Sequence, residues 1–377
     1  MNRTRYLSLC LLMLFAGCQK EDLPALVEVP NKRFLEVLIE RGVDTDGDSL
    51  INAAEAAAIT KLYLIGDSID NLTGIEAFVN LDTLWCGRLL IESLDVSENK
   101  ALVFLECYHN DLSTLDVSHN TNLVYLDCSF TDIASLDVSN NLLLETLYCE
   151  YTFLTALDLS SNQYLVSLNT LASPILQLDL TNLSALKTLT CSYNQLKDLD
   201  VSNNRNLEYL DCGYNQIASL NLSDNQALAD LNCESNPIPS LDITNNRALT
   251  RLICQKNQLS ELDLSSNTLL RTLFCAENQL TDLDVSSNPD LQWLDFRQNQ
   301  LTGIDVTACD SLHHFEGSFN QLTELDVSKN QFLTLLSLRQ MTSLGKVCVW
   351  TMPFPPNGFG LYTAGSPNVY FTTDCSR

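Results

Sequence analysis

A cysteine recurs every 21 residues through the middle of this chain, and this spacing constrains the fold more than any other feature. The nine cysteines on this grid are Cys86, Cys107, Cys128, Cys149, Cys191, Cys212, Cys233, Cys254 and Cys275. Thr170 occupies the one grid position inside the run that lacks a cysteine. Such a fixed period is typical of a repeat protein, whose units bury their apolar side only by stacking on their neighbours.

Each repeat unit has two halves. Aligned on the cysteine, a unit reads LxxLxCxxNxLxxLDVSxNxx, as in "LEYLDCGYNQIASLNLSDNQA" over residues 207–227. The segment LxCxxN alternates between inward and outward residues with a period of two, which predicts a short strand. Strands of successive units should stack in parallel about 4.8 Å apart, with the leucines and the cysteine inside.

This pattern resembles the leucine-rich repeat, and in particular the 21-residue nested class called IRREKO, in which both halves carry an LxxL core. The resemblance covers residues 61–341. It implies a mainly β solenoid of about thirteen parallel turns. The segment "LTGIEAFVNLDTL" over 72–84 resembles the first repeat of internalin-like proteins. A small helical cap is expected over 32–60 and an irregular cap over 342–377.

Three repeated positions are expected to have structural roles. The cysteines should be reduced core residues, with a metal ladder as the alternative. An asparagine three residues after the cysteine should satisfy backbone groups inside the bend. An aspartate in the second half, followed two residues later by Ser or Thr, should cap backbone N–H groups on the convex side, with a cation-binding stripe as the alternative. These aspartates are Asp95, Asp116, Asp137, Asp158, Asp179, Asp200, Asp242, Asp263, Asp284, Asp305 and Asp326.

The outward positions of the cysteine half vary from turn to turn, whereas the second half hardly varies. This asymmetry predicts a binding face on the concave side, where aromatic residues of the kind enriched at interfaces gather. The alternative is cross-strand aromatic packing that only stabilises the sheet. The candidate ligand-binding residues are Trp85, Phe104, Glu106, Tyr108, Tyr125, Asp127, Phe130, Tyr148, Tyr151, Tyr193, Tyr209, Asp211 and Tyr214.

The N-terminus reads as a targeting segment. Two arginines precede a short apolar run, which predicts a signal peptide over residues 1–17. The end of that run, "LFAGC", resembles a bacterial lipobox, which implies a lipid on Cys18, and "QKED" after it resembles the acidic surface-export tag of Bacteroidetes lipoproteins. Residues 18–31 would then tether the protein to the outer face of the outer membrane. The alternative is an ordinary secreted protein.

The segment "DTDGDSLINAAE" over 44–55 has the ligand spacing of an EF-hand loop. Oxygen ligands at such a spacing wrap a single calcium ion, so we expect one structural site that orders the N-terminal cap. Ser49 stands where glycine usually makes the sharp turn. The alternative is an acidic turn that opens a helix. The expected ligands, at loop positions 1, 3, 5, 7, 9 and 12, are Asp44, Asp46, Asp48, Leu50, Asn52 and Glu55.

Cys348 and Cys375 lie off the grid and are expected to form a disulfide in the C-terminal cap. The formal net charge of −26 argues against nucleic acid, because phosphate binding needs clustered Lys and Arg. We therefore expect a surface protein, not an enzyme, that binds a protein or glycan partner. A structural spacer is one alternative. A glycoside hydrolase is another, because Glu106 with Asp127, and Asp295 with Glu316, would stack on adjacent turns.

Overall fold

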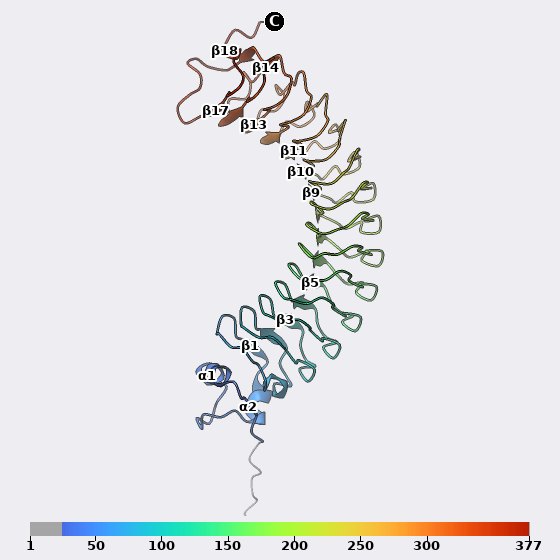
Figure 1. Cartoon of the computed structure of the whole chain (residues 1–377), viewed down its shortest axis with the longest axis vertical. Helices are drawn as coiled ribbons and strands as arrows, with labels where there is room; N and C mark the ends of the chain where they lie inside the picture. The colour runs from blue at the N-terminus through green and yellow to red at the C-terminus, as the bar shows by residue number, and fades with distance from the viewer. Residues whose placement is uncertain (1–24, 377) are drawn as a thin grey trace, which may run out of the picture.

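Residues 25–376 are described by a computed structural model. The chain forms an arc in which short strands line the inner side and irregular turns lie on the outer side, with two helices at the N-terminal end (Figure 1). Every pair of neighbouring strands is parallel, and the strands follow one another in chain order. The predicted leucine-rich-repeat solenoid is confirmed.

The concave sheet has fifteen strands of three residues each. Its middle strands are 21 residues apart, so the cysteine grid is also the strand register. In spatial order they are β1 (Lys61–Tyr63), β2 (Thr83–Trp85), β3 (Phe104–Glu106), β4 (Tyr125–Asp127), β5 (Thr146–Tyr148), β6 (Ser167–Asn169), β7 (Thr188–Thr190), β8 (Tyr209–Asp211), β9 (Asp230–Asn232), β10 (Arg251–Ile253), β11 (Thr272–Phe274), β12 (Trp293–Asp295), β13 (His314–Glu316), β15 (Leu335–Ser337) and β17 (Gly360–Tyr362).

The sheet continues past residue 341, where the array was predicted to end. Strand β17 pairs with β15 although the two lie 25 residues apart, because a longer loop carries the chain back to the sheet. A second sheet of three strands forms behind the last turns, from β14 (Glu324–Asp326), β16 (Lys346–Cys348) and β18 (Tyr370–Thr372). The C-terminal segment was predicted to be irregular, and it instead adds strands to both sheets. The 21-residue sequence period ends near residue 341, but strands continue to pair beyond it.

The N-terminal cap consists of α1 (Lys32–Glu40), α2 (Ala53–Ala58) and the 3-10 helix η1 (Ile75–Ala77). Helix α1 is capped by Asn31, whose side chain accepts a hydrogen bond from the Phe34 N–H, and it buries Phe34, Val37 and Leu38. Residues 25–29 were predicted as part of the tether. They belong to the cap instead, because Val27 donates to the Ile51 carbonyl at 2.8 Å and Val27 and Val29 pack against the core.

The core runs through the whole arc as one cluster. In the turn that begins at Leu207, the side chains of Leu207, Leu210, Cys212 and Ile217 are 0% exposed. The grid cysteines are free and buried, which confirms the prediction that they are reduced core residues. Burial raises the pKa of these thiols, to about 12 for Cys233. They therefore stay protonated and pack as small apolar groups, whereas a metal ladder would need thiolates.

The predicted asparagine column after the cysteine is confirmed. Asn215 is representative, since its Nδ2 donates to the carbonyls of Cys191 at 2.9 Å and Cys212 at 3.1 Å, and its Oδ1 accepts from the Leu196 N–H at 3.0 Å. One side chain thus joins two successive turns. The predicted aspartate caps are also confirmed, as in Asp158, whose Oδ1 accepts from the Ser160 N–H at 2.9 Å. These hydrogen bonds lower the pKa of Asp158 and keep its carboxylate charged.

A second asparagine column lies under the convex side, and the sequence analysis did not single it out. In Asn225 the Nδ2 donates to the carbonyls of Val201 at 3.0 Å and Asn204 at 2.9 Å. Its Oδ1 has no hydrogen-bond partner among the residues that the structure describes. Leu183 and Cys309 replace asparagine once each. The fully buried members are Asn99, Asn120, Asn141, Asn162, Asn204, Asn225, Asn246, Asn267, Asn288 and Asn330.

Candidate binding face

The concave strands present their first and third residues outward and bury the middle one. On β2 to β5 this alternation brings six of the predicted binding residues to the concave surface. All six are half-buried, because each packs along its flank against the neighbouring turns. They are Trp85, Phe104, Glu106, Tyr125, Asp127 and Tyr148.

Aromatic rings on these strands form a continuous row, which we call the inner row. The ring centroids of Trp85 and Phe104 are 5.3 Å apart, and those of Phe104 and Tyr125 are 4.2 Å apart in a parallel stack. Tyr63 extends the row at one end and Tyr148 at the other, at 5.9 Å and 5.8 Å from their neighbours. Cross-strand packing of this kind stabilises a sheet. Stacking within the inner row is therefore enough to explain why aromatic residues occur there. Tyr63 was missing from the predicted set.

The outward carboxylates Glu106 and Asp127 are register partners on β3 and β4. Burial raises the pKa of Asp127, and it raises that of Glu106 with a further contribution from the Asp127 charge. The second predicted pair is Asp295 and Glu316, on β12 and β13. There, Arg297 donates to both oxygens of Asp295, at 2.9 Å and 2.6 Å. A carboxylate held in this way is a poor nucleophile, which argues against glycoside hydrolysis at this pair.

A second set of aromatic side chains lies at the edge of the concave face, and we call it the edge row. Phe130 and Tyr151 stack at 4.6 Å, and Tyr193 and Tyr214 stack at 4.1 Å. Tyr151 and Tyr193 are 49% and 54% exposed, as predicted. Tyr214 was predicted to be exposed as well, but it is half-buried, because its ring stacks on that of Tyr193.

The residues of the edge row have an unusual backbone conformation. Every residue two places after the cysteine position, from Arg88 to Gln340, is left-handed, with φ between 50° and 60°. This conformation costs an ordinary side chain about 1–2 kcal/mol and favours glycine or asparagine. The turn therefore does not select an aromatic residue here. Phe130, Tyr151 and Tyr193 thus carry exposed rings at positions whose backbone conformation does not favour them.

The remaining predicted residues complete two separate groups. The ring of Tyr108 lies over Gly87 and leaves no room for a Cβ there, and the Arg88 guanidinium lies 5.6 Å from the ring centre. Tyr209 and Asp211 are outward on β8, and Ser192 donates a hydrogen bond to Asp211. Between the groups, the outward residues of β6 are Ser167 and Asn169, and the edge position is Ala172. The face therefore has one group over β2–β5 and a smaller one over β7–β8.

The acidic loop at the N-terminus brings together part of the predicted calcium set. One oxygen from each of Asp44, Asp46 and Glu55 lies within 4.8 Å of the others. Ser49 takes a left-handed φ of 68°, so it makes the turn that glycine usually makes. The Oδ1 of Asn52 is engaged differently, because it accepts from the N–H groups of Ala54 and Glu55 at the start of α2.

Glu55 itself is nearly buried and closes the loop. Its carboxylate accepts hydrogen bonds from the N–H of Asn52 at 3.0 Å and the N–H of Thr45 at 2.7 Å. These bonds, that from Asn52 most of all, lower the pKa of Glu55. Asp48 and Leu50 lie at the exposed end of the loop, where the Leu50 N–H donates to Asp48 at 2.8 Å. The loop combines a helix cap with three converging carboxylates.

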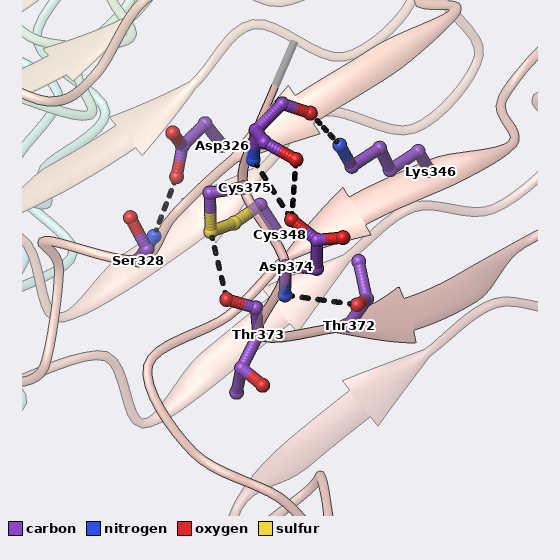
Figure 2. The surroundings of a disulfide bond; sticks show 9 residues. Asp326, Ser328, Lys346, Cys348, Thr372, Thr373, Asp374 and Cys375 are labelled. Carbon is purple, nitrogen blue, oxygen red and sulfur yellow. Dashed lines mark hydrogen bonds between the residues drawn. A yellow bond between two sulfur atoms is a disulfide. The ribbon is translucent and has the colours of Figure 1, made fainter.

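At the other end of the arc, a disulfide joins Cys348 of β16 to Cys375, the pair that the sequence predicts (Figure 2). The two Cα atoms are 5.5 Å apart. Close to it, the Lys346 ammonium donates to the Ser376 carbonyl at 2.8 Å. Both contacts hold the end of the chain against the three-stranded sheet and so close the solenoid.

Cys18, the predicted lipidation site, lies outside the described residues. Within residues 25–376, no helix combines the length and the apolar character that crossing a bilayer requires.

No protein-family model and no curated protein matches the sequence. Among solved structures, the functional domain of InlJ from Listeria monocytogenes is 34% identical over 80% of this chain and 70% of that one, with a TM-score of 0.72. That structure includes a cysteine ladder, a feature comparable to the nine-cysteine column described above.

Two more distant structures share the fold alone. The internalin InlF from Listeria monocytogenes is 20% identical over 95% of this chain and 100% of that one, with a TM-score of 0.71. The plant peptide hormone receptor RGFR1, solved in complex with RGF2, is 18% identical over 79% of this chain and 56% of that one, with a TM-score of 0.62.

Proposed function

Because this chain belongs to the internalin-type leucine-rich-repeat proteins, we propose that it binds a protein partner through the concave face over β2–β5. The observation that carries the proposal is the pair Phe130 and Tyr151. Their rings are exposed at positions whose left-handed backbone disfavours aromatic residues. The solved complex of the plant receptor with RGF2 gives this fold a precedent as a binding scaffold.

The proposed interface combines rigid apolar anchors with negative charge. The inner row supplies a floor of half-buried aromatic rings, the edge row supplies exposed rings, and Glu106 and Asp127 lie between them. Aromatic anchors of low conformational freedom are common hot spots. The carboxylates favour a partner that brings Lys or Arg, and the net charge of −26 would steer such a partner toward the protein. The partner we propose is therefore a basic extracellular protein.

A screen of extracellular proteins with two versions of the chain tests this proposal. The wild-type chain and a double variant, Phe130→Asn with Tyr151→Asn, would be applied to the same immobilised panel. We expect at least one protein that binds the wild type and is lost by the variant. If every protein retained by the wild type is retained equally by the variant, the concave edge row is not the binding site. If nothing binds the wild type, the spacer alternative is favoured.

We further propose that Cys18 carries a lipid that holds the protein at the outer surface. The proposal rests on the lipobox-like "LFAGC" and the acidic "QKED" that follows it. Cys18→Ala should move the protein from the membrane fraction to the soluble fraction of the cells that make it. A protein of normal size that stays in the membrane fraction after this change would refute lipid anchoring at Cys18.

A structural calcium ion in the N-terminal loop is the third proposal. Asp44, Asp46 and Glu55 would hold it, because their oxygens already converge and Ser49 already makes the required turn. Asn52, whose side chain caps α2, fits a helix-capping role better than that of a ligand. Bound calcium would offset two of the three negative charges and fix the start of α2 beneath the first repeat.

Calcium should therefore raise the melting temperature. Extracellular calcium modules bind with Kd values of about 10⁻⁴–10⁻³ M, so a few millimolar calcium should add about 1–2 kcal/mol of stability. Glu55→Gln should abolish the calcium-induced shift, since glutamine preserves the helix cap but loses the charge. Glu36→Gln in α1, which removes an exposed carboxylate from the same cap, is the matched control and should keep the shift. Equal shifts in both variants would place the calcium elsewhere.

A further inference from the structure

A second hollow lies on the concave face in the C-terminal half of the arc, far along the sheet from β2–β5. Its volume is about 510 Å³ and its walls come from strands β11, β12, β13 and β15. None of the predicted ligand-binding residues lines it, but Asp295 and Glu316, the second candidate glycoside-hydrolase pair, do. We call it the Trp293 hollow. Its side chains differ in type from those of the edge row, so its function has to be considered separately.

An uncharged pair of stacked aromatic rings lines the Trp293 hollow. The indole of Trp293 stacks on the imidazole of His314 with centroids 3.7 Å apart and planes within 6° of parallel. Trp293 remains 43% exposed in spite of this stack. Burial, with the neighbouring His313, lowers the pKa of His314, so its ring is neutral at physiological pH. The stacked pair therefore offers an apolar surface that needs no counter-charge.

The rim of the hollow is polar, and its charges are already paired. Arg297 binds Asp295 through two hydrogen bonds, and its Nε lies 4.0 Å from an oxygen of Glu316. Asp295 is only 7% exposed, which fixes the guanidinium in place. Gln255 adds a neutral amide, whose Nε2 donates to the Glu234 carboxylate. The rim thus presents rigid donors and acceptors without an unpaired cation that would attract an anionic ligand.

An adjoining hollow of about 240 Å³ shares Arg297, Glu316 and Leu335 with the first. It ends at Tyr362 on β17, which is 42% exposed and carries the Arg339 guanidinium 4.6 Å from its ring centre. From β12 to β17 the sheet takes three strand steps, a span of roughly 14 Å. The two hollows therefore form one groove with an aromatic ring near each end and a polar rim between them, and the Arg339 guanidinium lies against the ring at the β17 end.

We propose that this groove binds a neutral oligosaccharide, with one sugar ring stacked on Trp293. A pyranose ring has an apolar face of C–H groups that matches an exposed indole, and its equatorial hydroxyls lie at the rim, where Arg297, Glu316 and Gln255 offer hydrogen bonds. A span of roughly 14 Å accommodates about three rings in an extended chain. The proposal rests on these side chains and not on the protein-binding face over β2–β5.

Calorimetric titration of the full chain with neutral trisaccharides tests the proposal. The probes are maltotriose, chitotriose and mannotriose, each compared with its monosaccharide, and trilysine is the charged comparison. We expect at least one trisaccharide to bind at least about tenfold more tightly than its monosaccharide. Binding of trilysine alone, or no heat from any neutral probe up to roughly 20 mM, would overturn the assignment.

Substitutions at the two ends of the groove test where the sugar binds. Trp293→Ala should weaken the best trisaccharide at least about tenfold, and Trp293→Phe should recover part of the loss. Tyr362→Ala should reduce the advantage of the trisaccharide over the monosaccharide, because it removes the far end of the groove. The matched control is Trp85→Ala, an outward tryptophan of the same sheet on β2, which should leave sugar binding unchanged. Equal losses in Trp85→Ala and Trp293→Ala, with both variants folded by circular dichroism, would refute this site.

Discussion

Asn225→Asp should lower the free energy of unfolding by about 3–5 kcal/mol, which is the usual cost of an unpaired buried charge. The side chain is 0% exposed, and its Nδ2 donates to the carbonyls of Val201 and Asn204. Aspartate has the same shape but replaces that donor by an oxygen that faces two carbonyl oxygens. If the carboxyl takes up a proton instead, it supplies one donor for two acceptors. Urea denaturation followed by circular dichroism would measure the loss.

Asn206→Asp is the matched control for this change. The Nδ2 of Asn206 also donates to a backbone carbonyl, that of Ser184 at 2.9 Å, but the residue is exposed. Water can solvate the new charge there, so the cost should stay within about 1 kcal/mol. Asn225→Leu should fall between the two, since Leu183 occupies the same column position. Equal losses for Asn225→Asp and Asn206→Asp would show that the buried column does not join the turns.

The double variant Phe130→Asn, Tyr151→Asn should lose at least about 2 kcal/mol of partner binding, or roughly 30-fold in Kd, if these rings are hot spots. Its stability should change by less than about 1 kcal/mol. The lost ring stack costs about 0.5–1.5 kcal/mol, but asparagine tolerates the left-handed backbone that the aromatic residues occupy at a cost. Thermal denaturation and biolayer interferometry with a partner from the screen would measure the two quantities.

Cys212→Ser is the control for that prediction, because it should lower stability and leave partner binding unchanged. It places a hydroxyl in a fully buried position and should cost about 1–3 kcal/mol of stability if the hydroxyl stays unpaired, while partner affinity per folded molecule stays the same. A double variant that unfolds while Cys212→Ser remains stable would reverse the assignment of the two faces. The second half of the repeat, with its aspartate caps, would then be the contact surface.

The repeat made most of the fold predictable from the sequence. The cysteine grid set the strand register, and the asparagine and aspartate columns were assigned correctly because each position recurs many times. The C-terminal extension of the sheet could not be predicted in this way, since β15 and β17 lie 25 residues apart and no period links them. The convex asparagine column was visible in the motif, but its burial depends on how deep the turn lies, which the pattern alone does not determine.

The candidate site was only partly predictable, for a different reason. Alternation identified which side chains face outward, but it did not show that Phe104 and Tyr125 stack on each other, or that Tyr214 lies against Tyr193. The left-handed backbone at Phe130 and Tyr151 carries no sequence signature, because residues as different as Ala172 and Lys256 share it. Asp295 and Glu316 were singled out from the sequence, but the Trp293 hollow around them was not, because its other members are spread over several turns. Their proximity depends on the curvature of the sheet and on side-chain rotamers.

Photo-cross-linking across the two faces of one turn tests the central claim most directly. A photoreactive phenylalanine analogue would replace Phe130 or Tyr151 on the concave edge, and Ser139 or Ser160 on the convex side of the same turns. All four positions are exposed, so each variant should fold normally. With the partner found by the screen, we predict covalent adducts from the two concave positions and none from the two convex positions. Adducts from Ser139 and Ser160, with none from Phe130 and Tyr151, would contradict binding through the concave face.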